Sequence, residues 1–170
     1  MKIKKALFLI FGLAIILYTI TYISDYSLTI DLSPRKHIHK VKCLSDSISP
    51  LKKFNFESDD SWEAHLVLDF HDVNQLPKDL PRANYLKTTD ISVLKNMGKT
   101  WNFKCSHGDM ATVTSKLLLT KNGTVVFETG IHITNEIQGL QSEDFGWIQS
   151  KAILQDVKKF KRSFMPVIFI

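Results

Sequence analysis

The sequence predicts an α+β fold, in which an antiparallel β-sheet carries one longer C-terminal helix and is preceded by a single N-terminal transmembrane helix. Three observations predict this fold class. An uncharged apolar run covers Ala6 to Ile23, alternating apolar and polar residues recur between residues 26 and 129, and an apolar stripe at helical spacing follows Ser142. The chain after the apolar run is long enough to bury a core of its own.

The apolar run has the length of a membrane span. Its residues rise about 1.5 Å each as a helix and cover about 27 Å, close to the roughly 30 Å of bilayer hydrocarbon. Lys2, Lys4 and Lys5 precede the run, and positively charged flanks stay in the cytoplasm. In a bacterium this places the protein in the inner membrane with its C-terminal domain in the periplasm. The predicted division is a cytoplasmic tail at 1–5, a transmembrane anchor at 6–23 and an exported globular domain at 24–170.

The apolar run is interpreted as an uncleaved anchor, with a cleaved signal peptide as the alternative. No small-x-small cleavage site follows the run. Cleavage after Ala14 would leave an apolar core of only about eight residues, at the lower limit of a signal sequence. Tyr18 and Tyr22 near the end of the run suit a membrane interface.

Period-2 alternation predicts the first strands. Tyr26–Leu32 is predicted as a strand, and His37–Leu44 as a second extended run. Residues 45–61 are rich in turn formers and are expected to be irregular. The strongest strand signal covers Trp62–Phe70, with one face in the core and the other largely wet.

The middle of the chain predicts a loop, a short helix and a hairpin. Two prolines make Pro77–Asn84 a loop, and a helix should then run from a cap at Thr89 or Asp90 to Gly98. Trp101–Cys105 is predicted as a strand, followed by a turn at 106–109. Asn122-Gly123 between two extended runs predicts a tight hairpin turn, because both residues tolerate positive φ.

The C-terminal third is predicted as the long helix. Ser142 and two acidic residues resemble a helix start, and Lys158–Arg162 supplies the cations that favour a helix end, with anionic lipid headgroups as the alternative use of those cations. The apolar tail Ser163–Ile170 needs burial, and Pro166 confines it to an edge strand. The stripe consists of Phe145, Ile148, Ala152, Ile153, Val157 and Phe160.

Charge and cysteine content bound the class of protein. After Asp25 the chain carries 19 Lys and Arg against 16 Asp and Glu, a dispersed surplus that argues against nucleic acid as a partner. Cys43 and Cys105 lie in the exported part, where an oxidising compartment predicts a disulfide between them. Neither belongs to a CxxC motif.

Several residues resemble parts of catalytic or metal-binding patterns, but none completes a motif. His37 and His39 share a strand face, and His65, His71 and His107 with Asp109 are further ligand candidates, but no zinc motif unites them, so no metal or cofactor is predicted. Asp69, His71 and Asp72 at the end of the best strand suggest a periplasmic hydrolase as an alternative. No Gly-x-Ser-x-Gly turn supplies a nucleophile, so no catalytic residue is predicted and a non-enzyme is favoured.

The remaining interpretation is a membrane-anchored module that binds a protein partner in the periplasm. Phe145, Trp147 and the loop Pro77–Asn84 are the candidate contact residues, with core packing as the alternative use of both aromatic rings. The layout of basic tail, single span and disulfide-bearing domain is similar to that of membrane-anchored immunity proteins that neutralise bacteriocins. This resemblance rests on no specific residue. The same layout occurs in single-span components of secretion, division or exclusion complexes, which is the alternative function.

Overall fold

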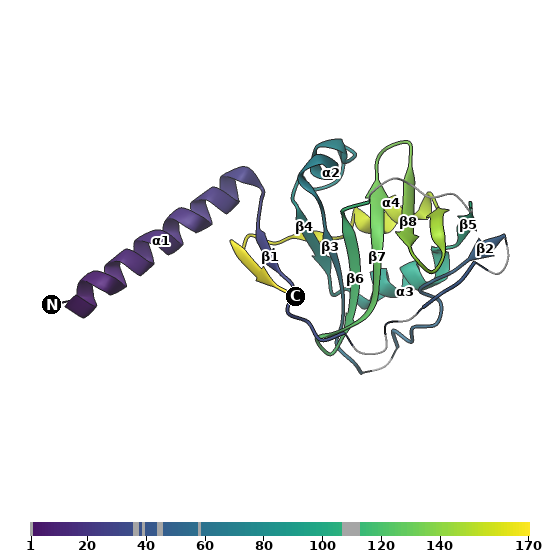
Figure 1. The fold of residues 1–170 in the computed structure, drawn as a ribbon, viewed down its shortest axis with the longest axis horizontal. Coiled ribbons are helices and arrows are strands. Elements are labelled where there is room, and N and C mark those ends of the chain that lie inside the picture. The colour runs from purple at the N-terminus through teal and green to yellow at the C-terminus, as the bar shows by residue number, and fades with distance from the viewer. Residues whose placement is uncertain (1, 36–37, 39, 44–45, 58, 107–112) are drawn as a thin grey trace.

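The computed structural model describes residues 2–35, 38, 40–43, 46–57, 59–106 and 113–170 (Figure 1). A long helix, α1 (Lys2–Ser24), projects from a folded domain that combines an antiparallel sheet with three shorter helices among the described residues. The mixed α+β class is therefore confirmed. The shorter helices are α2 (Phe70–Gln75), α3 (Ile91–Thr100) and α4 (Ala152–Val157).

Nine strands form the main sheet of the described chain, and every neighbouring pair in it is antiparallel. Two further strands, β1 (Leu28–Ile30) and β11 (Val167–Phe169), form a separate parallel sheet beside the end of α1 (Figure 1). The order of the main sheet is β10 (Lys161–Arg162), β4 (Tyr85–Thr88), β3 (Trp62–Val67), β6 (Lys116–Lys121), β7 (Thr124–Ile133), β8 (Gln138–Ser142), β9 (Gly146–Gln149), β5 (Phe103–Cys105) and β2 (Ser47–Ile48).

Local signals located several elements correctly. Asn122 and Gly123 have φ of 51° and 72° and form the turn between β6 and β7, as the tight hairpin requires. The Asp90 side chain caps α3 by accepting a 2.8 Å hydrogen bond from the Ser92 backbone N–H. The helix does not end at Gly98, however. A Cβ there would lie 3.2 Å from Phe56 Cε2, so Gly98 serves the packing of Phe56 against α3, and the helix runs on to Thr100.

The predicted extended run His37–Leu44 forms no strand at its described residues, 38 and 40–43, while His37, His39 and Leu44 lie outside the described residues. The strand at Trp62 is shorter than predicted. Asp69 accepts a hydrogen bond from the His71 backbone N–H and caps α2, so the chain leaves the sheet before Phe70. Strand β4, which follows the predicted loop, was not predicted.

The predicted long C-terminal helix is also wrong. Residues 138–149 form the β8–β9 hairpin, and only the six residues of α4 are helical. The Ser142 hydroxyl accepts hydrogen bonds from the backbone N–H groups of Asp144 and Phe145, so the residues that resemble a helix cap hold a turn instead. Gly146, at φ 67°, completes this turn in a conformation that disfavours a helix.

The sheet is covered on both faces. One face belongs to the main hydrophobic core, to which α3 and α4 also contribute buried residues. On the other face the C-terminal tail supplies a smaller core, in which Ile168 and Ile170 pack with Tyr85, Leu118 and Val125. The tail is therefore buried on one side as predicted, but its partner is β1 rather than the main sheet. Representative members of the main core are Leu66, Leu94, Met97, Leu117, Phe127, Ile131 and Ile153.

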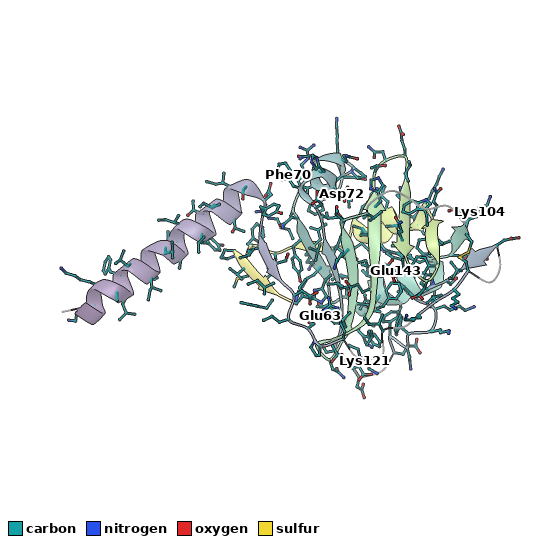
Figure 2. The ribbon with its side chains drawn as sticks, in the orientation of Figure 1. Glu63, Phe70, Asp72, Lys104, Lys121 and Glu143 are labelled. Atoms are coloured by element: carbon teal, nitrogen blue, oxygen red, sulfur yellow. A yellow bond between two sulfur atoms is a disulfide. The ribbon has the colours of Figure 1, made fainter. Side chains whose placement is uncertain are left out.

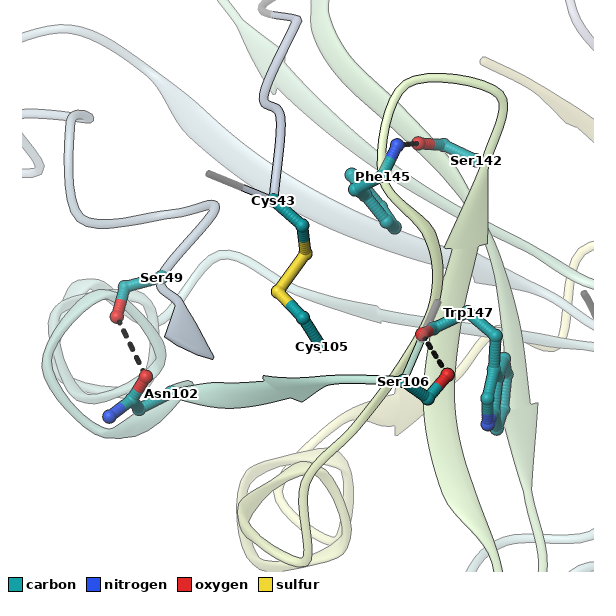
Figure 3. The surroundings of a disulfide bond; sticks show 8 residues. All are labelled: Cys43, Ser49, Asn102, Cys105, Ser106, Ser142, Phe145 and Trp147. Atoms are coloured by element: carbon teal, nitrogen blue, oxygen red, sulfur yellow. Dashed lines mark hydrogen bonds between the residues drawn. A yellow bond between two sulfur atoms is a disulfide. The ribbon is translucent and has the colours of Figure 1, made fainter. Parts of the chain in front are cut away.

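Cys43 and Cys105 form a disulfide (Figure 3). The bond joins the segment before β2 to β5, near one edge of the main sheet. Because 62 residues separate the two cysteines, the crosslink restricts a large loop in the unfolded chain.

Replacing both Cys43 and Cys105 with serine should lower the free energy of unfolding by about 4 kcal/mol, the chain-entropy effect of opening this loop. Denaturant unfolding of the full chain in detergent micelles, followed by tryptophan emission, measures this loss. The intact mass of the wild type should be two hydrogens below that of the reduced chain. A wild type with two free thiols, or a double variant of unchanged stability, would contradict the prediction.

Candidate functional site

The junction between α1 and the folded domain is built around Arg162. Its guanidinium donates hydrogen bonds of 3.1 and 3.2 Å to the backbone carbonyls of Thr21 and Tyr22, in the last turn of α1, and pairs with the Asp25 carboxylate. The last carbonyls of a helix lack partners within it, and a cation there complements the helix dipole. The guanidinium also lies 4.6 Å from the centroid of the Phe164 ring. One side chain from β10 thus holds the end of the apolar helix.

The short linker after α1 is also held by the domain. The buried side chain of Asn84 accepts a 2.7 Å hydrogen bond from the Ser27 backbone N–H and donates a 2.8 Å bond to the Ser27 carbonyl. The Asn84 backbone N–H donates to the Asp25 carbonyl at 3.3 Å. The ring of Tyr22 lies 6.0 Å from that of Phe164, measured between centroids. Helix α1 therefore continues into the domain without a free hinge at residues 25–27.

A small basic hollow lies beside the junction. It has a volume of about 320 Å³, and Lys87, Lys159, Lys161 and Arg162 contribute cations to its lining, against the single carboxylate of Asp90. Carboxylates just outside the lining, those of Glu63, Asp156 and Asp25, pair with three of these cations, so the charges around the hollow balance. The predicted helix end at Lys158–Arg162 is wrong, because α4 ends at Val157 and Lys161 and Arg162 belong to β10.

The region proposed for a hydrolase contains a serine, a carboxylate and a histidine in an unsuitable order. The Ser115 hydroxyl donates to the Asp72 carboxylate, and His132 Nδ1 lies 3.7 Å from that carboxylate on the other side. In a hydrolytic triad the imidazole lies between nucleophile and carboxylate, where it can take the hydroxyl proton. Here the carboxylate is in the middle and Ser115 is fully buried. Asp72 lies at the α2 end of the sheet (Figure 2), and these bonds tie α2 to β6 and β7.

The histidines do not converge in the part of the chain that the structure describes, where no group of three His, Cys, Asp or Glu could hold a metal ion. His37, His39, His107 and Asp109 lie outside the described residues. His71 is exposed and contributes only its backbone N–H to the α2 cap.

His65 was expected on the wet face of its strand, but it is only 3% exposed. Its ring nitrogens lie 2.7 Å from the Tyr85 hydroxyl and 3.2 Å from the Thr120 hydroxyl. Burial lowers the pKa of His65 to about 4, although the nearby Glu63 carboxylate opposes the shift. The imidazole is therefore neutral near pH 7 and acts as a buried hydrogen-bonding group.

The two aromatic contact candidates are buried in the β8–β9 hairpin. Phe145 is 7% exposed and Trp147 is 3% exposed. The Trp147 ring covers Gly139, where a Cβ would lie 2.3 Å from Cη2. Figure 3 shows the Phe145 ring on the side of the disulfide and the Trp147 ring turned away from it. Little of either ring is available to a partner in this conformation, and core packing accounts for both.

A larger hollow lies between α3 and the loop at residues 49–57. We call it the lysine groove; its volume is about 490 Å³ and its lining includes Lys52, Lys95, Lys99, Phe54 and Phe56. Glu57, the only carboxylate in the lining, lies 3.4 Å from Lys95. The groove therefore combines aromatic surface with a surplus of positive charge. Sequence reasoning missed it because residues 45–61 carry no periodic pattern.

Comparisons of the chain with protein-family models, with curated proteins and with solved structures give no match.

Arg162→Gln should loosen the junction, because glutamine cannot bond Asp25 and both helix carbonyls at once. Loss of charge-assisted bonds should lower the free energy of unfolding by about 2 kcal/mol and speed cleavage before Asp25 by endoproteinase Asp-N. The fragment masses identify the cleavage site. Arg35→Gln is the matched control, because it removes a guanidinium that pairs with Asp31 and Glu128 instead. Equal cleavage before Asp25 in the two variants would contradict the junction.

His65 should make the domain sensitive to acid. Between pH 6.5 and 4 the unfolded chain binds a proton that the folded chain does not, so the free energy of unfolding falls as the pH falls through this window. The full loss is about 3 kcal/mol. Denaturant unfolding at about pH 7 and about pH 4.5 should show a larger loss for the wild type than for His65→Gln, which has no titrating ring. Equal losses would show that His65 is not the sensitive group.

Proposed function

We propose that this protein is a membrane-anchored binding protein of the periplasm, which holds a protein partner close to the membrane as an inhibitor or an immunity protein against a toxin does. The observation that carries the proposal is the Arg162 junction, because it makes the apolar helix part of the folded structure. Helix α1 is long and apolar enough to cross a membrane, with a mean hydropathy of 2.4 over its span and only 6% of that span buried within the protein.

The charges and the disulfide support one orientation. Lys4 and Lys5 precede the span, and positive residues favour the cytoplasmic side. The domain after the span contains the Cys43–Cys105 disulfide, which suits an oxidising compartment. In this orientation residues 1–5 are cytoplasmic and residues 24–170 lie in the periplasm.

The junction favours a permanent anchor over a cleaved signal peptide. Cleavage after the apolar run would remove the Thr21 and Tyr22 carbonyls that Arg162 bonds, and with them the contact between the Tyr22 and Phe164 rings. Of its three acceptors at the junction, the Arg162 guanidinium would keep only the Asp25 carboxylate. A signal peptide that is discarded has no reason to be bonded to the mature domain.

The lysine groove is the surface that we assign to the partner. Aromatic side chains commonly anchor protein interfaces, and complementary charge speeds association. Lys52, Lys95 and Lys99 around Phe54 would receive an acidic segment that also carries an apolar side chain. The proposed partner is therefore a protein with an acidic contact surface.

One observation favours the alternative function, a single-span component of an envelope complex. The α1 side chains that the structure describes are mostly exposed, and nothing lies within 4 Å of a Cβ placed at Gly12, so the helix could pack against another membrane helix. Replacing residues 6–20 with an unrelated apolar sequence, while keeping Thr21 to Asp25 for the junction, separates the functions. If the chain is a binding protein, its function in the cell should survive this replacement. If it is an envelope component, its function should be lost.

Affinity capture with the tagged full chain in nanodiscs tests the binding function. The wild type should retain one periplasmic protein in stoichiometric amount, identified by mass spectrometry. Lys52→Glu with Lys99→Glu should weaken this binding by about tenfold or more, because both charges then repel an acidic partner. Lys78→Glu with Lys151→Glu is the matched control at two other exposed lysines and should bind normally. Equal loss in the two double variants would reject the groove, and no retained protein would reject the binding function.

A further inference from the structure

The small sheet of β1 and β11 has one outward face that is entirely apolar. The register pairs Leu28 with Val167 and Ile30 with Phe169, and paired residues of adjacent strands share a face. Hydrogen bonds from Leu28 N–H to the Pro166 carbonyl and from Leu32 N–H to the Ile170 carbonyl extend the pairing at both ends. Alternate residues therefore continue the same face. We call this the apolar face; it consists of Leu28, Ile30, Leu32, Met165, Val167 and Phe169.

The opposite face of the small sheet is already used. Ile168 and Ile170 point to the main sheet and are each 8% exposed, within the smaller core. On the apolar face, by contrast, Leu28 is 59% exposed and Phe169 is 66% exposed. Leu32 and Met165 are 70% and 60% exposed. A continuous exposed apolar surface of this kind marks a contact with another apolar phase.

The position of the apolar face indicates what covers it. Strand β1 begins four residues after α1 ends, and β11 follows the junction residues Arg162 and Phe164 in the chain. Figure 1 shows both strands on the side of the domain nearest α1. Tyr22 and Tyr26, at the end of the span, are 60% and 45% exposed. Tyrosine at the end of a membrane span lies at the level of the lipid headgroups, so the neighbouring apolar face lies near that level too.

We infer that the apolar face lies in the outer interfacial layer of the lipid bilayer, with its side chains against the headgroup and acyl-chain boundary. The inference rests on the proposed anchoring by α1, and it adds a second membrane contact of a different kind. Amphipathic surfaces of this type enter the interface by roughly 5–10 Å. The exposed Lys161, close to the apolar face in the chain, then lies among the lipid phosphates.

This placement fixes which side of the domain faces outward. The small sheet covers one face of the main sheet, and α3 packs in the core on the other face. The lysine groove is formed by α3 and the loop at 49–57, so it lies on the side away from the small sheet. A domain that rests on its apolar face therefore presents the lysine groove to the periplasm.

Tryptophan emission of the full chain, reconstituted in vesicles of phosphatidylethanolamine and phosphatidylglycerol, tests this inference. Phe169→Trp places a ring on the apolar face, and Ile137→Trp is the matched control at the β7–β8 turn, away from α1, where the native side chain is 42% exposed. Trp62, Trp101 and Trp147 are buried and give the same background in both variants.

The added emission of Phe169→Trp should shift to the blue, lose most of its intensity to lipids brominated on the acyl chain, and resist aqueous acrylamide. The added emission of Ile137→Trp should respond to acrylamide alone. Leu28→Trp, a second site on the apolar face, should repeat the first pattern.

Co-flotation of the chain with the vesicles distinguishes a failure of the α1 anchor from a failure of the membrane contact of the apolar face. A chain that floats while Phe169→Trp is quenched by acrylamide overturns the membrane contact of the apolar face and leaves the anchor intact. A ring protected from both quenchers means that protein, such as a second copy of this chain, covers the face, and this also overturns the inference. A chain that does not float overturns the anchor and the apolar-face contact together.

Discussion

The Arg162 guanidinium is the group on which the placement of the whole domain depends. It bonds a carboxylate and two carbonyls at the end of α1, and the Asn84 bonds to the linker support the same junction. Charge-assisted bonds in a partly enclosed site are stronger and more directional than neutral ones. Because β10 pairs with β4 at the edge of the main sheet, the position of the sheet is transmitted directly to the helix.

The second constraint is the need to cover the sheet on both faces. The main core occupies one face, and the C-terminal tail covers Tyr85, whose hydroxyl contacts His65, on the other. Pairing with β1 holds the tail on this face of the main sheet. Strand β1 in turn begins four residues after α1 ends. The same few residues therefore complete the smaller core and present the apolar face. The segment after α1 contributes both to the junction with the helix and to the folding of the domain.

Sequence patterns predicted the features that depend on neighbouring residues. The apolar run, the Asn122-Gly123 turn and the Asp90 cap all follow from local chemistry. Ser142 shows the limit of such reasoning, because a serine hydroxyl that can cap a helix can also stabilise a turn between strands. In the sequence, only Gly146 favours the turn over the helix. The cations at 158–162 suit the end of a helix because of the helix dipole, but the structure places them after α4 and in β10.

Contacts between residues far apart in the chain could not be predicted from the sequence. Arg162 and Asp25 are 137 positions apart in the chain, and nothing in the pattern around either one points to the other. The parallel pairing of β1 with β11 joins the first and last strands of the folded domain and has no turn signal between them. The disulfide is the exception, because the chain has only two cysteines and they have a single possible pairing.

The most direct test of the central claim is photo-crosslinking from the end of the helix to the domain. The photoreactive residue p-benzoylphenylalanine replaces Tyr22 in the full chain, which is then irradiated in nanodiscs. The ring at this position contacts Phe164, so mass spectrometry should find an intramolecular crosslink to the peptide that contains residues 162–165. Crosslinks to lipid alone, with none to that peptide, would show that the domain is not fixed to the helix and would contradict the account.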